Sequence, residues 1–110
     1  MVRELLARGA AVNAAINNGA TPLYIASRKG HLEVVRELLA RGAAVDAAYN
    51  NGATPLLIAS AMGHLEVARE LLARGASPGL AAHNGSTALS RATANGHAAI
   101  VQLLRAALEA

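Results

Sequence analysis

Apolar and charged residues alternate at helical spacing in several segments of the chain. Between residues 31 and 42, Val34, Val35, Leu38 and Leu39 recur three or four positions apart, with Glu and Arg between them. This spacing places the apolar side chains on one face of a helix. The segment is therefore predicted to be an amphipathic helix with that face buried.

A turn and a shorter helix precede this segment. The Asn-Gly pair at 18–19 favours the positive φ of a tight hairpin-type turn. Thr21 can cap the next helix, and Pro22 suits its first turn, where a missing N–H costs nothing. Gly30 can end this helix in a left-handed conformation, and Gly42 can close the second helix. The predicted unit is turn, helix, turn, helix.

The unit recurs with a period of 33 residues. Residues 16–48 and 49–81 are identical at 24 of 33 aligned positions. Self-similarity at such a period indicates a stacked repeat architecture. The positions that we expect to be equivalent include Thr21, Thr54 and Thr87, then Gly30, Gly63 and Gly96, and the Leu-Leu pairs at 5–6, 38–39, 71–72 and 103–104.

Three motifs follow one another in the unit: Thr-Pro-Leu, Gly-His-Leu-Glu-Val-Val and Leu-Leu-x-x-Gly-Ala. At this period they resemble the ankyrin repeat family over the whole chain. The resemblance implies an all-α solenoid of helix-turn-helix units, with β-hairpin-type turns between repeats and a concave surface that binds proteins. The single domain, 1–110, would contain a partial repeat at 1–15, repeat 1 at 16–48, repeat 2 at 49–81 and a capping repeat at 82–110.

One departure from the family pattern concerns helix capping. The His that usually follows Thr-Pro-Leu is replaced by Tyr24, Leu57 and Ser90. We expect the capping hydrogen bonds of that His to be lost or altered. The change should affect the caps and hairpins more than the fold.

The two ends of the stack are predicted to differ. Arg91 replaces Ile25 and Ile58 at one helical position, and we expect its charge to mark the polar outer face of a terminal unit. Residues 1–9 supply only the end of a second helix, so apolar surface of the first repeat should stay open. Such a chain is either a piece of a longer array or a weak homo-oligomer that associates through this end.

Composition excludes several classes of protein. The 110 residues are 54% apolar and 2% aromatic and include no Cys, which rules out disulfides and Cys-based metal sites. No apolar run approaches the roughly 18 residues of a membrane span. The N-terminal segment MVRELLARG is charged throughout, unlike a secretory signal. We expect an intracellular protein, cytoplasmic or nuclear, with no membrane partner.

No catalytic or metal-binding residues are predicted. His31, His64 and His97 share one position of the repeat. Packed helices, however, lie about 8–10 Å apart, whereas zinc ligands converge to about 2 Å from one ion. No phosphate-binding loop or nucleophile motif is present. We therefore expect no enzyme activity and no cofactor.

The net charge of +3 does not predict a nucleic-acid partner. Glu37 and Glu70 each precede an Arg by four residues, the favourable order for an ion pair on a helix. This pattern indicates a mixed, solvated face, and aromatic side chains for base stacking are lacking. Only Arg28-Lys29 forms an unpaired basic step.

The leading interpretation is a non-catalytic module that binds a partner protein. The alternative is an engineered or excised scaffold with no dedicated ligand, favoured by near-identical repeats, abundant Ala and few of the Trp, Tyr and Arg residues typical of interface hot spots. In the family, the first-helix ends and hairpin tips face the partner. Carried over by position, they are Asn17, Asn18, Ala20, Arg28 and Lys29; Tyr49, Asn50, Asn51, Ala53, Ala61 and Met62; and His83, Asn84, Ser86, Ala94 and Asn95.

Overall fold

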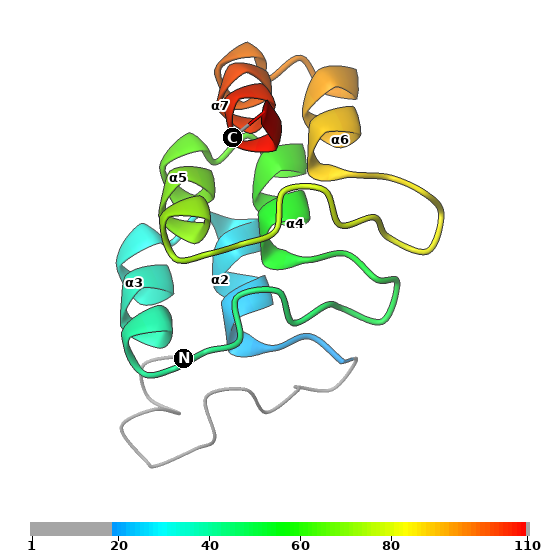
Figure 1. The fold of residues 1–110 in the computed structure, drawn as a ribbon. Helices are drawn as coiled ribbons and strands as arrows, with labels where there is room; N and C mark the ends of the chain where they lie inside the picture. Colours follow the sequence, from blue (N-terminus) through cyan, green and yellow to red (C-terminus); the bar gives the residue numbers. More distant parts are fainter. Residues whose placement is uncertain (1–18, 110) are drawn as a thin grey trace.

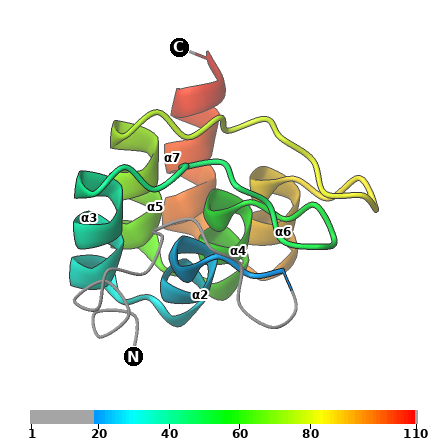
Figure 2. The same ribbon diagram turned by 90° about the horizontal axis from the view of Figure 1, so that it is seen from below.

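The computed structural model describes residues 19–109, which form three helix pairs (Figure 1). The first helices of the pairs lie in one row, which we call the inner row, and the second helices lie in another, which we call the outer row. The same two rows are seen from below in Figure 2. The predicted all-α solenoid is confirmed. The pairs are α2 (Pro22–Lys29) with α3 (Leu32–Ala40), α4 (Pro55–Met62) with α5 (Leu65–Ala73), and α6 (Ala88–Ala94) with α7 (Ala98–Glu109).

The first two inner-row helices begin and end as the sequence predicts. Thr21 Oγ1 accepts a hydrogen bond from the backbone N–H of Tyr24 at 3.2 Å, and Thr54 does the same for Leu57 at 3.1 Å. Each Thr thereby satisfies an N–H that the helix itself leaves unpaired. Gly30 ends α2 in the left-handed region with φ 74°.

The third unit alters its cap, as the lost His suggested. Thr87 Oγ1 accepts from the backbone N–H of Ser90 at 3.1 Å, and Ser90 Oγ accepts from the N–H of Thr87 at 2.9 Å. This reciprocal pair is a capping box, which satisfies two N–H groups at once. In α2 and α4 the replacements are instead apolar contacts, described with the groove below.

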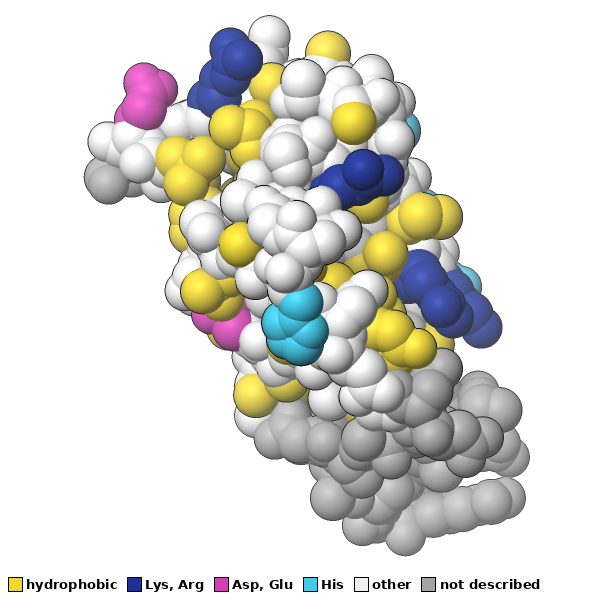
Figure 3. Space-filling model, turned by 90° about the vertical axis from the view of Figure 1, so that its right-hand side faces the viewer, with side chains coloured by type: hydrophobic (Ala, Val, Ile, Leu, Met, Phe, Trp, Pro, Cys, Tyr) yellow, Lys and Arg dark blue, Asp and Glu magenta, His cyan; other side chains and the backbone are white. Residues whose placement is uncertain are grey.

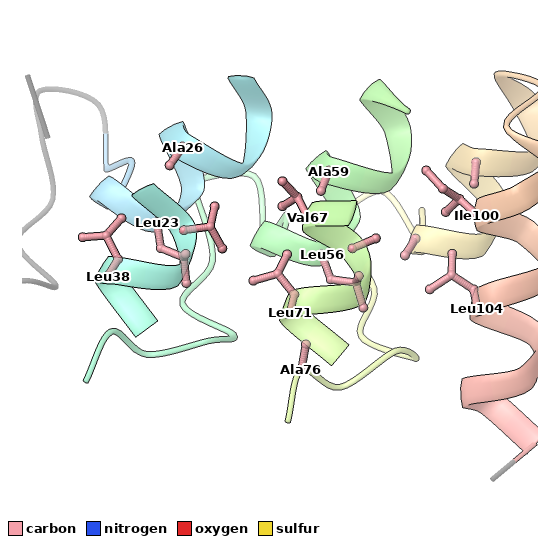
Figure 4. Packing of buried hydrophobic residues seen from close by; sticks show 14 residues of the cluster. Leu23, Ala26, Leu38, Leu56, Ala59, Val67, Leu71, Ala76, Ile100 and Leu104 are labelled. Atoms are coloured by element: carbon pink, nitrogen blue, oxygen red, sulfur yellow. The ribbon is translucent and has the colours of Figure 1, made fainter. Parts of the chain in front are cut away.

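The apolar core runs from unit to unit through equivalent positions. Leu38, Leu71 and Leu104 are all fully buried and belong to one cluster. Figure 4 shows Leu38 beside Leu23 and Leu71 beside Leu56, so each second helix packs on its own first helix in the same way. Because no unit surrounds its own apolar face, neighbouring units must cover it.

The predicted buried face of the helix at 32–40 is narrower than expected. Val35 and Leu38 are fully buried, whereas Val34 and Leu39 are partly buried at the edge of the core. Gly42 follows this helix with φ 91°, in agreement with the prediction that it closes the helix. The face therefore centres on one i, i+3 pair.

Glu70 links two outer-row helices and is less solvated than the sequence suggested. Its side chain is 16% exposed, and its carboxylate lies 3.1 Å from both Arg36 of α3 and Arg74 of α5. The hydrogen bond to Glu70 raises the pKa of Arg36. In α7 the position equivalent to Glu70 is Leu103. The final Leu-Leu pair, 103–104, is therefore shifted by one residue, and only Leu104 keeps the predicted register. The ion-pair contact thus joins the first two described units only.

The repeated histidines join consecutive units. His64 Nε2 lies 2.9 Å from the carbonyl oxygen of Arg28, and His97 Nε2 lies 3.1 Å from that of Ala61. Each ring also covers the glycine that ends the preceding helix, because a Cβ at Gly63 would lie 2.8 Å from His97 Cε1. The interpretation of these two side chains as structural is therefore supported by their contacts.

The outer face of the third unit is polar, but not because of Arg91. Ser60 is fully buried, while its equivalent Thr93 is exposed and donates to the carbonyl of Leu89 at 2.7 Å. Arg91 lies on another side of its helix and lines the groove described below, so its expected place on the end face was wrong. The predictions for residues 1–9 and the open N-terminal end lie outside the described residues.

We predict that Gly63 and Gly96, which share a left-handed conformation with φ of 84° and 76°, differ in their tolerance of alanine. Gly96→Ala should lower the free energy of unfolding by about 1–2 kcal/mol, the cost of left-handed backbone, because nothing lies within 4 Å of its Cβ position. Gly63→Ala should cost about 1–3 kcal/mol more, because the methyl group meets the His97 ring. Urea unfolding followed by circular dichroism measures both, and equal losses would contradict the contact.

Candidate functional site: the groove between the fingers and the inner helices

The connections between units form hairpin-type fingers beside the inner row of helices (Figure 1). In the second finger, residues 49–53, the N–H of Tyr49 donates to the carbonyl of Ala53 at 2.8 Å. In the third finger, residues 82–86, the N–H of Ala82 donates to the carbonyl of Ser86 at 2.8 Å. The N–H of His83 then donates to the carbonyl of Asn51 at 2.9 Å. The two fingers therefore lie side by side and hold each other in place.

A second apolar cluster lies between the fingers and the inner helices. Tyr24 and Leu57 are buried there, at the positions where the family usually has His. The Tyr24 ring stacks on Tyr49 with ring centres 4.9 Å apart and planes 15° from parallel. The replacements thus exchange a polar capping group for apolar packing that supports the fingers from below.

A hollow of about 460 Å³ opens above this cluster, between the second and third fingers and helices α4 and α6. We call it the groove. Met62 is its most accessible apolar side chain, with 53% of the residue exposed. Figure 3 shows hydrophobic side chains between basic ones on this face. The groove is lined by Tyr24, Asn51, Ala53, Leu57, Ile58, Ala61, Met62, Ala82, His83, Asn84, Ser86, Arg91 and Asn95.

The groove is positively charged. Its lining includes Arg91 but no Asp or Glu. Arg28 and Lys29 are exposed at the end of α2, in the unit next to Met62. Within residues 19–109, none of these three cations forms an ion pair, whereas Arg36, Arg69 and Arg74 each pair with a Glu. Arg41 and Arg105, outside the groove, are likewise absent from these pairs, so the feature that distinguishes the groove is the absence of Asp and Glu from its lining.

The structure brings half of the predicted contact residues together. Arg28 and Lys29 are exposed beside the groove, Ala94 is exposed outside its lining, and Asn17 and Asn18 lie outside the described residues. The predicted residues that line the groove are Asn51, Ala53, Ala61, Met62, His83, Asn84, Ser86 and Asn95.

Some predicted contact residues serve packing more than contact. Ala20 and Ala53 are only 4% and 3% exposed and belong to the second apolar cluster, so they offer little surface for contact, although Ala53 also lines the groove. Tyr49 is half-buried under its stack with Tyr24. The side chain of Asn50 lies against Gly19, in the way that His83 lies against Gly52.

Five lining residues were missed by the sequence analysis. Ile58 and Arg91 lie one helical turn before Met62 and Asn95, and Leu57 lies one turn before Ala61. Residues four apart share a helix face, so this spacing could have revealed them. The full set of missed residues is Tyr24, Leu57, Ile58, Ala82 and Arg91.

The groove presents apolar, amide and cationic side chains. No group of three or more His, Cys, Asp or Glu residues within residues 19–109 could hold a metal ion. Asn51 and Asn84 use their Oδ1 atoms to accept from the backbone N–H groups of Ala53 and Ser86. None of the helices in this part of the chain is long and apolar enough to span a membrane.

We predict that the Tyr24 phenol ionises at unusually high pH. Burial raises its pKa above the ordinary 10.0. The neutral phenol therefore favours the folded state, and this contribution is present below pH 10 and lost as the pH rises above it. In the Tyr49→Phe variant, Tyr24 is the single remaining Tyr. Absorbance titration of this variant should give a higher pKa for the Tyr24 phenol in the folded protein than in the protein unfolded by urea. Equal values in the two states would contradict burial of the phenol.

Comparison with known families agrees with this architecture. The family model described as ankyrin repeats, in three copies, matches residues 1–82 and 48–109. A search of curated proteins found no match. Together with the three helix pairs and their fingers, the family match covers nearly the whole chain, and the chain belongs to the ankyrin repeat family.

Proposed function

We propose that this chain is a non-catalytic module that binds a partner protein through the groove and the finger tips. Ankyrin repeats are generally protein–protein interaction modules, which supports binding as the class of function. The single observation that carries the choice of site is the exposed, apolar and cationic groove of about 460 Å³. We further propose that it acts in the cytoplasm or nucleus, on the sequence alone.

The rigidity of the fingers supports this proposal. The bond from His83 to Asn51 and the Tyr24–Tyr49 stack hold the groove walls before any partner arrives. Walls that are already ordered lower the entropy lost on binding. The exposed Met62 side chain adds an adaptable apolar contact. These features favour an interface more than a merely tolerated surface.

The competing proposal is an engineered or excised scaffold without a dedicated ligand, which associates with its own copies through the N-terminal end. Its support is the near-identity of two repeats and the abundance of Ala. The groove favours the binding module, because self-association at the end of the stack would make no use of it.

A charge placed in the groove should abolish partner capture. Met62→Glu introduces a carboxylate into the hollow, and its exposed position should leave the fold intact. Leu108→Glu is the matched control, because Leu108 is 44% exposed and lies outside the groove. Cross-linking capture with quantitative mass spectrometry should recover the same partners in similar amounts with the wild type and Leu108→Glu. The recovered amounts should be at least about tenfold lower with Met62→Glu. Equal recovery with both variants would overturn the groove as the binding site.

A further inference from the structure

The cations beside the groove lack the acidic neighbours that pair with Arg36, Arg69 and Arg74. Within residues 19–109, the acidic side chains lie on α3 and α5, in the loop at Asp46 and near the end of α7 at Glu109. None of them lines the groove, where Arg91 stands, or pairs with Arg28 or Lys29. A ligand that carries negative charge would supply the missing partners.

The amide side chains add donors of the same preference. The Oδ1 atoms of the groove-lining residues Asn51 and Asn84 already accept from the backbone of their own fingers, so the amide groups can offer a ligand their Nδ2 donors. Together with the Arg91 guanidinium, they present N–H groups above an apolar floor. Carboxylate oxygens accept from such groups in short, charge-assisted hydrogen bonds.

The repeat register sets the spacing of these features. Lys29, Met62 and Asn95 occupy one position in three successive units. Packed helices lie about 8–10 Å apart, so an extended chain rising about 3.3 Å per residue covers one unit in about three residues. Arg91 precedes Asn95 by one helical turn, which places its charge on the far side of Met62 from Lys29.

We propose that the groove selects an acidic segment of a partner protein, with an apolar side chain that enters the hollow against Met62 and Ile58. A carboxylate about three residues to one side of this side chain meets Arg28 and Lys29, and one about three residues to the other side meets Arg91. The inference rests on the proposed function and names the chemistry of its partner. Because all three cations are exposed, salt should screen both contacts.

A peptide-display selection on the full chain tests this proposal. The probe is a random peptide library. Each peptide, when extended, is about twice as long as the distance in space from Lys29 to Asn95. Peptides that bind should be enriched in Asp or Glu flanking a large apolar residue. Their binding should weaken at least about tenfold in the Arg28→Ala, Lys29→Ala, Arg91→Ala variant and at high salt.

The control variant removes the same charge elsewhere. Arg41→Ala, Arg69→Ala, Arg105→Ala also deletes three exposed cations, all outside the groove, and should change affinity less than about threefold. Circular dichroism shows whether each variant is folded.

Each other outcome contradicts a definite statement. Selected peptides that lack Asp and Glu, and that no longer bind the Met62→Glu variant, would contradict the acidic partner. They would still support the groove as the binding site. Peptides unaffected by Met62→Glu, or no enrichment at all, would overturn the proposed function itself. A single-stranded DNA oligonucleotide serves as a second probe, and tighter binding of it through the same three cations would show that the groove binds nucleic acid instead.

Discussion

The structure depends on apolar packing between neighbouring repeats. Leu38, Leu71 and Leu104 are fully buried at equivalent positions, although each belongs to a helix pair too small to enclose it. The next unit must therefore supply the missing contacts, and it can do so only at a constant offset along the chain. The period of 33 residues is the consequence of that constraint.

The same offset builds the groove. The packing of neighbouring units also places His64 over Gly30 and His83 over Gly52. The fingers are thereby brought close enough for the backbone bond between His83 and Asn51. The groove, the core and the contacts between His and Gly residues thus all depend on one repeated contact between units. A change that loosens the stacking of units would therefore also deform the groove.

Much of the fold could be predicted because its causes are local. Thr21 caps α2 through an atom three residues away, and Gly30 ends that helix through its own φ. The groove was harder to predict, because its residues come from two fingers and three helices. Ala53 looked like a fingertip contact and is buried, and Arg91 looked like the end of the stack and lines the groove. Each error arose where neighbours from another unit decide exposure.

The sequence by itself determined the repeat, its helix caps and the family, because a period and a capping residue are properties of the chain alone. Only the tertiary structure decided which side of each helix is open. Tyr24 and Leu57 stand where the family usually has His, and the sequence did not predict that they would form an apolar support for the fingers. Likewise, Arg28 and Lys29 of the first described unit and Arg91 of the third lie on either side of the middle unit only because the three units stack, and the sequence alone does not show this position in space.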